Sequence, residues 1–599
     1  MSQVFAPGLT AHARSTRIAQ RQCSKIPGLL PQDSQASGFH KRATLPKLAA
    51  RNKGSAVAAR TPLFGSNKWI PRHLGAWAAA LAVVLAAAGL IFALTWPHRP
   101  RLVGEMRITS HPGLVVAEPK VGNSFALPSA GIAGSQPDKS IAVLPFVDVS
   151  DSQDQEYFSD GLAEELIDHL THSPELKVIA RTSSFQFKAG NEDVRAIAHQ
   201  LGVAHVLEGS VRKSGQQLRV TAQLIRASDG AHLWSQTYDR NLGDIFKVQD
   251  EIGEQVSQAL HVVFRAGPAA GNQQPDVQAY NYVLEGNYFK ARRTLGDAEK
   301  AAELYQQALD INPNYALAWA RLASAYLRQE VLQGPPAQDR NERVLEALNH
   351  AMRLDPNLTW AYYTRAGFEL MVTWDWAAVQ ADTERMRAID PQFDLLPSAF
   401  GDIALAFGEV DDAVKWYEND IERNPLDPNA LDALGVALCA ANRLEQCLQI
   451  RLRLQQLHPE FDGVNSAVGK TRLYLGQFPA ALEAMQREPN EDYRLADLAM
   501  VYWATAKRAE SNAALASLKE KFAASDAYGI AQVYAYRKNN DEAFQWLDRA
   551  YRQHHAGMLD IAADPLLHNL HGDPRFRTLL THMRLTDRVD PRSTATASN

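Results

Sequence analysis

The apolar positions along the chain fall into three patterns. The run from Leu74 to Trp96 contains no charged residue. At about 1.5 Å per residue, a helix of this length crosses the roughly 30 Å hydrocarbon core of a bilayer. The run shows no polar face, and it lies too far from residue 1 to be a typical signal peptide. This first pattern therefore predicts a single, uncleaved transmembrane helix over residues 74–96.

The second pattern, over residues 140–264, alternates short β-type runs with helical spacing. The apolar run Ile141–Phe146 predicts a strand, and Glu156–His172 places apolar residues at helical intervals. The other predicted elements are strands at 176–181, 204–215, 217–230 and 232–240 and helices at 193–201 and 245–264. The resulting order, βαβαβββα, predicts an α+β domain.

The third pattern repeats a two-helix unit over residues 276–557. Prolines close these units at Pro313, Pro356, Pro391, Pro425, Pro459 and Pro489. Their spacing clusters on 34 residues, and small residues such as Gly286 precede aromatic residues such as Tyr305. The segment resembles tetratricopeptide (TPR) repeats, which implies an all-α solenoid of about eight units. Residues 558–586 follow as a predicted capping helix region, because the end of a solenoid needs a cover.

Four further segments show no sustained apolar period. Residues 1–73 predict a basic, disordered cytoplasmic tail, and residues 587–599 predict a second disordered tail. Residues 97–139 and 265–275 have the composition of linkers. The predicted fold class is therefore multidomain, with a single transmembrane helix, an α+β domain and an all-α TPR solenoid.

Charge predicts an orientation for the apolar run. Residues 1–72 contain twelve basic residues and one acid, Asp33. Because basic residues flank the cytoplasmic end of a transmembrane helix, this predicts a bacterial inner-membrane protein with a cytoplasmic N-terminus and periplasmic C-terminal domains. The rest of the chain carries more acidic than basic residues. That excess argues against nucleic acid as its partner.

Several motifs carry a resemblance to a known domain. SIAVLPF, EYFSDGLAEELIDHL, VIARTSSFQFK and LGVAHVLEGSVRK follow one another within residues 140–264. In this order they resemble the TolB amino-terminal-like domain of bacterial envelope proteins, which precedes TPR repeats in many chains. The resemblance implies a small module for protein contact, with no catalytic residues to carry over. In related chains the cytoplasmic end is often a winged-helix DNA-binding domain or a nucleotide cyclase, and residues 1–72 cannot be either.

The first helix of each TPR unit is expected to present one face to a groove. The groove candidates at equivalent positions are Asn287, Ser324, Asp402, Val436, Met500 and Gln532. Their mixture of polar and apolar side chains suits an extended peptide or a partner helix. The alternative is that the 140–264 domain of the same chain covers the groove.

We expect no catalytic residue, cofactor or metal. Gly463–Thr471 resembles a phosphate loop, but its glycine spacing is one residue too long and no strand precedes it. Two histidine pairs near the carboxyl end lack a convincing third metal ligand. Acidic residues crowd the helix predicted at 156–172, where we interpret them as surface carboxylates rather than an acid–base pair.

These observations favour a non-catalytic function. We expect a membrane-anchored periplasmic scaffold or sensor component that binds protein or peptide partners of the cell envelope through the TPR groove. The alternative is a one-component transmembrane transcriptional regulator of the winged-helix type that lacks its cytoplasmic effector domain.

The first prediction concerns Cys439 and Cys447, which lie near the end of one predicted helix and early in its antiparallel partner. They face each other across the turn, and the predicted compartment is oxidising. The alternatives are a disulfide and two buried thiols. If the disulfide forms, a free-thiol count of unreduced, denatured protein detects neither cysteine. A count that includes both would rule the bond out.

Overall fold

The computed structural model describes residues 139–586, apart from 189–191, 264–274, 293 and 334–337. Several predicted segments lie outside the described residues: the tails at 1–73 and 587–599, the transmembrane helix at 74–96, and almost all of the linkers at 97–139 and 265–275.

The prediction of a membrane-spanning protein is corrected. Within the described residues, no helix is long and apolar enough to cross a bilayer, because the helices are amphipathic and carry charged residues. The fold class that included a single transmembrane helix, and the localisation in a bacterial inner membrane with periplasmic domains, are therefore withdrawn. The described chain instead contains a mixed sheet domain followed by a large helical array.

The sheet of the first domain is parallel on one side and antiparallel on the other. Its strands are β1 (Ser140–Val143), β2 (Val147–Asp148), β3 (Lys177–Val178), β4 (His205–Ser214), β5 (Gln217–Arg226) and β6 (His232–Asn241). They lie in the order β3-β1-β4-β5-β6, with β2 paired to β4. Glycines at positive φ, Gly215 at 57° and Gly230 at 72°, allow the two tight turns that join β4, β5 and β6.

Helices cover both faces of this sheet. They are α3 (Glu156–Thr171), α4 (Arg181–Ser184), α5 (Val194–Leu201) and α6 (Ile245–Ala259). Ile141 and Val143 pack with α3 and α6, whereas Ala142, between them, packs with α5 in a second core. Because successive strand residues point to opposite faces, a strand covered on both sides is apolar throughout. The predicted strand at 176–181 is shorter in the structure, since α4 begins at Arg181.

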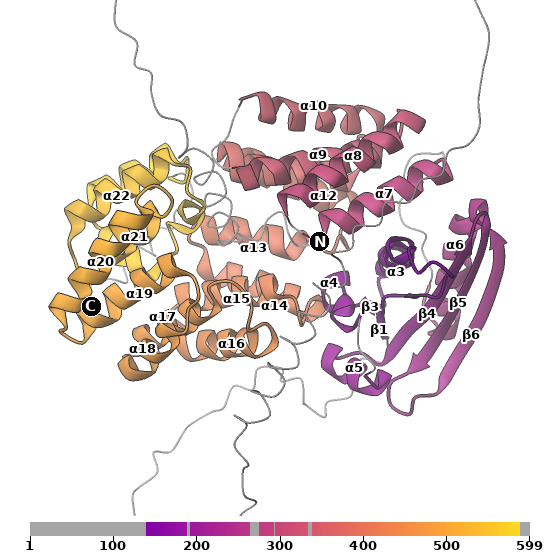
Figure 1. Cartoon of the computed structure of the whole chain (residues 1–599), viewed down its shortest axis with the longest axis horizontal. Coiled ribbons are helices and arrows are strands. Elements are labelled where there is room, and N and C mark those ends of the chain that lie inside the picture. The colour runs from indigo at the N-terminus through magenta and orange to yellow at the C-terminus, as the bar shows by residue number, and fades with distance from the viewer. Residues whose placement is uncertain (1–138, 189–191, 264–274, 293, 334–337, 587–599) are drawn as a thin grey trace, which may run out of the picture. The chain divides into compact units, whose positions relative to one another are not determined.

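The helical array consists of antiparallel helix pairs (Figure 1). The pairs are α7 (Val277–Lys290) with α8 (Leu295–Ile311), α9 (Ala316–Gln333) with α10 (Gln338–Leu354), α11 (Thr359–Phe368) with α12 (Trp376–Ile389), α13 (Leu396–Ala406) with α14 (Val410–Arg423), α15 (Pro428–Ala440) with α16 (Leu444–Leu457), α17 (Val464–Tyr474) with α18 (Phe478–Gln486), α19 (Glu491–Ala504) with α20 (Arg508–Phe522), and α21 (Ala527–Tyr536) with α22 (Asn540–Arg552).

The two helices of a pair approach most closely at a small residue. A Cβ atom added to Gly286 would lie 2.5 Å from the ring of Tyr305, and one added to Gly401 would lie 2.5 Å from the ring of Tyr417. Both tyrosines are almost completely buried. Interiors are packed too densely to admit an extra methyl group here. The glycine in each first helix is therefore required by the aromatic ring in the second.

The carboxyl-terminal segment joins the last unit to the third. It contains η4 (Ala556–Asp560), η5 (Pro565–Leu570) and α23 (Pro574–His582). The indole Nε1 of Trp376 donates a hydrogen bond to the carbonyl of Met583 at 2.9 Å. The ring of Trp374 stacks on His554, with centroids 3.8 Å apart. This segment therefore does more than cover the last repeat, because one hydrophobic core spans α11–α13 and α21–α23.

The sheet domain packs directly on the first four units of the array. Leu284 of α7 fills the space beside Gly161 of α3, so a Cβ on that glycine would lie 2.7 Å from the leucine. At the fourth unit, the amide of Leu426 donates to the Ser183 hydroxyl at 3.0 Å, and Thr182 donates to Asn424 at 2.7 Å. These contacts fix α3 and α4 against the repeats.

We predict that Gly286→Ala and Gly401→Ala each lower the free energy of unfolding by about 2 kcal/mol, because the added methyl group would overlap a buried tyrosine ring. Gly296→Ala is the matched control. It lies in α8 with nothing within 4 Å of the added carbon, so it should be neutral or slightly stabilising. Urea denaturation of the three variants measures both effects. Equal effects of Gly286→Ala and Gly296→Ala would contradict this packing.

Candidate functional site

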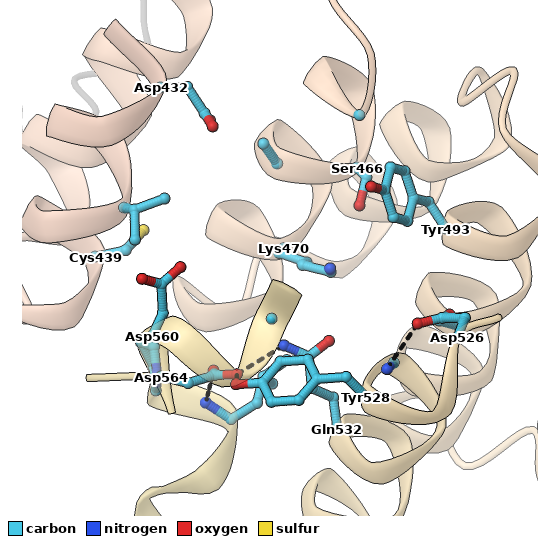
Figure 2. Close-up of a pocket in the computed structure, with 18 of the residues that line it drawn as sticks. Asp432, Cys439, Ser466, Lys470, Tyr493, Asp526, Tyr528, Gln532, Asp560 and Asp564 are labelled. Atoms are coloured by element: carbon cyan, nitrogen blue, oxygen red, sulfur yellow. Dashed lines mark hydrogen bonds between the residues drawn. The ribbon is translucent and has the colours of Figure 1, made fainter. Parts of the chain in front are cut away.

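A cavity of about 210 Å³ opens on the concave side of the last four units (Figure 2). It is lined by the first helices of these units, α15, α17, α19 and α21, and by residues 555–566 of the carboxyl-terminal segment. We call it the groove cavity.

Helical spacing decides which side chains reach the groove cavity. On α15 the lining residues are Asp432, Val436 and Cys439, and on α17 they include Ser466 and Lys470. Residues three or four apart lie on the same face of a helix, so each first helix contributes one row of side chains. The second helices of the units contribute little, apart from Arg451 of α16.

The walls of the groove cavity are rich in carboxylates. Asp432, Asp462, Asp492, Asp526, Asp560 and Asp564 all line it. Asp564 is well satisfied, since it accepts hydrogen bonds from the Tyr528 hydroxyl at 2.8 Å and the Gln532 amide at 2.7 Å. By contrast, Asp560 has no hydrogen-bonding or cationic partner for its side chain within the described chain.

Two cations and a histidine offset only part of this negative charge. Arg451 lies 3.4 Å from Asp432, and the Nζ atom of Lys470 lies 3.7 Å from the fully buried Asp497. The Nε2 atom of His555 lies 3.7 Å from one oxygen of Asp526. In Figure 2 the Nζ atom of Lys470 points to the side of Asp526 rather than to that of Asp560. Acids therefore outnumber cations around the cavity.

Burial and like charges raise the pKa values of these acids. Burial is the main cause for Asp526, whose pKa rises to about 7, with Asp492 and Asp497 adding to the shift and Lys470 opposing it. Burial likewise raises the pKa of Asp560 to about 7, and the Asp564 carboxylate reinforces the effect. Carboxylic acids with these pKa values exchange protons near neutral pH. The charge of the cavity therefore changes over the physiological range.

Two of the predicted groove residues line the cavity and four do not. Val436 and Gln532 lie in its wall. Asn287 and Asp402 instead accept hydrogen bonds from Tyr305 at 2.8 Å and Tyr417 at 2.7 Å, the tyrosines of their own units. The remaining two candidates, Ser324 and Met500, are buried, with Met500 completely enclosed in the core.

The difference between these positions follows from the second helix of each unit. Where that helix carries a tyrosine, the tyrosine hydroxyl donates a hydrogen bond to the polar residue that follows the glycine. In the fifth and sixth units Arg451 and Met485 stand opposite Gly435 and Gly469, in place of a tyrosine. The neighbouring residues, Val436 and Lys470, therefore stay available to the groove cavity.

Lys470 is the main residue that sequence reasoning missed. It occupies in α17 the place that Val436 occupies in α15, directly after the small residue. The signal was present, because Gly469 falls at the small-residue position of the sixth repeat, but the residue after it was not considered for the groove. In the structure this segment is the start of a helix, and Gly469 lies against Met485 as in the other units. The aspartates of the carboxyl-terminal segment were also missed, because nothing in the sequence places them in the groove.

Cys439 and Cys447 are joined as a disulfide in the structure, with their Cα atoms 5.4 Å apart. The bond links α15 to α16 within the fifth unit, and Cys439 also lines the groove cavity. A disulfide at this place would hold two cavity-forming helices together. The bond's presence in solution stays a prediction that the free-thiol count tests.

The carboxylates of α3 are not surface acids, contrary to the sequence interpretation. Asp160 and Glu164 are buried, at 4% and 8% exposure. Glu164 forms ion pairs with Arg181 at 3.1 Å and with Arg321 of α9 at 4.0 Å. The surface interpretation failed because α3 packs against the array. Glu164 thus serves the contact between the sheet domain and the repeats.

The histidines named as weak metal candidates make ring contacts. His554 stacks on Trp374, and His571 stacks on Phe576 with centroids 4.5 Å apart. Burial lowers the pKa of His571 to about 4. In the part of the chain that the structure describes, no group of three or more His, Cys, Asp or Glu side chains is placed to hold a metal ion.

Comparisons with protein families match two parts of the chain. Residues 290–330 match the TPR repeat family. The TPR part of the prediction is confirmed. Residues 137–255 match the second domain of HilA/YgeH-like transcriptional regulators. The sheet domain is thus similar to a regulator domain, and its resemblance to the TolB domain stays a prediction.

One relative shares a longer stretch. Over 239 residues the chain is 35% identical to "Putative adenylate cyclase 3" of Rhizobium meliloti (strain 1021), which covers 39% of this chain and 40% of the relative. The chain therefore spans less than half the length of the relative it matches.

Solved structures with a similar region include PilF of Pseudomonas aeruginosa, at 13% identity and a TM-score of 0.29, covering 35% of this chain and 91% of that one. Another is YrrB, described as a TPR protein with an unusual peptide-binding site, at 19% identity and a TM-score of 0.26, covering 34% and 99%. Scores this low support no functional inference.

We predict that stability falls as the pH rises from about 4 to 8, because the folded protein holds protons on Asp526 and Asp560 that the unfolded chain has released. An acid with a raised pKa contributes stability below its unfolded pKa, and that contribution is lost as the pH passes its folded pKa. Asp560→Asn should flatten the profile and raise stability at pH 8 by about 1 kcal/mol.

Urea denaturation at about pH 5, 6.5 and 8 measures this effect. Asp412→Asn is the control, because Asp412 lies exposed on α14 beside Lys415, outside the groove cavity. It should leave the pH profile as in the native sequence. Parallel profiles for Asp560→Asn, Asp526→Asn and the control would show that the cavity acids ionise as they do in water.

Proposed function

We propose that the chain is a non-catalytic interaction scaffold that binds an extended protein segment in the groove cavity of its last four TPR units. The observation that carries this proposal is the open cavity itself, lined by groove-facing positions of α15, α17 and α21. TPR arrays use such concave surfaces to bind partners. The TPR repeats of the chain support a protein or peptide as the partner.

The contacts of the sheet domain also favour the last four units as the place where a partner binds. Arg321 of α9 faces Glu164 of α3, and its guanidinium lies 3.9 Å from the centre of the Trp360 ring of α11. Arg321 of the second unit is thus engaged by the sheet domain of the same chain. No described residue of the sheet domain lines the cavity at the last four units, so we assign partner binding to that cavity.

A non-catalytic role is favoured by how the buried charges are used. Glu164 pairs with Arg321 of the repeats, and Asp160 pairs with Lys188 of its own domain. The name of the relative in Rhizobium meliloti refers to a cyclase, but this chain spans 40% of that protein. We therefore do not propose the relative's activity for this chain.

The second candidate function is a component of a transcriptional regulator. It is supported by the match of residues 137–255 to the second domain of HilA/YgeH-like regulators. In this case the sheet domain would provide the main contact with a partner. The two candidates differ in which domain a partner needs.

We predict that Ala467→Phe abolishes partner capture, because Ala467 lines the groove cavity and a phenyl ring would fill it. The control is Ala513→Phe, on an exposed position of α20. Both variants are made in the full chain and compared with the native protein by crosslinking and affinity capture. Partners that are lost only with Ala467→Phe support the groove. Partners that survive both changes and need residues 140–264 would favour the regulator.

A further inference from the structure

We infer that the segment bound in the groove cavity is basic, and that its Lys or Arg side chains lie beside Asp526 and Asp560. This inference rests on the proposed function and adds the chemistry of the partner.

One carboxylate oxygen of Asp526 lacks a hydrogen-bond partner among the described residues. Asp526 is 8% exposed, and one of its oxygens, Oδ1, accepts a hydrogen bond from the amide of Gly529 at 2.9 Å. The other oxygen, Oδ2, is buried without a hydrogen-bond partner among the described residues. A buried polar atom without a partner is costly, so such atoms usually meet a ligand, a water molecule or an ion. Asp526 lines the cavity, which places this atom beside the proposed ligand.

The carboxylate of Asp560 also lacks a neighbouring cation among the described residues. Asp560 lies in the cavity wall, and the two charged groups that act on it, Asp564 and Asp432, are also acidic. Arg451 already pairs with Asp432, and Lys470 with Asp497. Neither cation is paired with Asp560. A cationic guest would lower the energy of Asp560 and of the unbonded oxygen of Asp526, and an anionic guest would raise it.

The cavity suits one long side chain better than a whole cofactor. Its volume of about 210 Å³ is below the range of about 300–1,000 Å³ of typical small-molecule sites. The rings of Tyr493 and Tyr528 are part of its lining. Aromatic faces attract ammonium and guanidinium groups, and Lys470 already lies 6.0 Å from the centre of the Tyr493 ring. The walls therefore combine the two kinds of group that hold a basic side chain.

A metal ion is a poorer occupant of this site. Across the described residues, the acids of the cavity do not converge as a set of three or more possible metal ligands. They are spread over α15, α19, the segments that precede α17 and α21, and the carboxyl-terminal segment. Such a spread matches a chain that runs along the groove and carries positive charge.

The experiment selects random twelve-residue peptides on phage against the full-length protein and, in parallel, against Ala467→Phe and Val436→Phe. Peptides lost with both blocking variants are those that bind the groove cavity. We expect these peptides to be enriched in Lys and Arg. The best of them is synthesised in a charged and an uncharged form. If its basic residue is Arg, the uncharged form carries citrulline, which has the same shape without the charge; if it is Lys, the uncharged form carries acetylated Lys.

Binding is then measured with the native chain, Asp560→Asn, Asp526→Asn and the control Asp412→Asn. The charged peptide should bind at least about tenfold more tightly than the uncharged one to the native chain and the control. This preference should shrink in Asp560→Asn and Asp526→Asn. Circular dichroism of each variant verifies that it is folded.

The outcomes separate this inference from the proposed function. Groove-dependent peptides without basic enrichment, or with equal affinity for both peptide forms, would overturn the inference and leave the scaffold function standing. If no selected peptide depended on the groove cavity, the proposed function and the inference would both fail.

Discussion

The array depends on the close crossing of two helices at a residue that has almost no side chain. Gly286 and Gly401 leave just enough room for the rings of Tyr305 and Tyr417. A helix pair cannot bury its apolar side alone, so each unit needs its neighbours and the ends of the array need covers. The sheet domain contacts the first units, and the carboxyl-terminal segment joins the last unit to the third.

The same crossing decides which groove positions are free to bind. A tyrosine hydroxyl in the second helix donates a hydrogen bond to the polar residue that follows the glycine, as it does to Asn287 and Asp402. In the fifth and sixth units another residue replaces the tyrosine, and Val436 and Lys470 line the groove cavity. The replacement in the fifth and sixth units therefore coincides with the place where the groove cavity opens.

The acidic residues of the groove cavity lower the stability of the folded chain. Carboxylates from several elements are brought into a partly enclosed space, and burial and mutual repulsion raise their pKa values towards neutrality. Acids with strongly shifted pKa values often mark functional sites, because a bound ligand can offset the free-energy cost of burying them close together. Here the core shared with the carboxyl-terminal segment holds the walls in place, and the predicted disulfide between α15 and α16 would add to this.

The sequence by itself determined the local elements and the repeat. Periodicity of two and of about 3.6 residues located the long strands β4–β6 and the helices, and the 34-residue spacing of prolines and small residues indicated the TPR units. These features are local, so the residues that cause them lie within one element or one unit. It also predicted a membrane-spanning fold and localisation, which are withdrawn.

Only the tertiary structure decided what each groove position does. Asp560 and Asp564 lie more than one hundred residues from Asp432, and no local pattern brings them together. The burial of Glu164 likewise depends on Arg321, on a distant helix. Charge placement and burial are properties of contacts between remote segments, which is why the site was predicted in part and its acidic character was not.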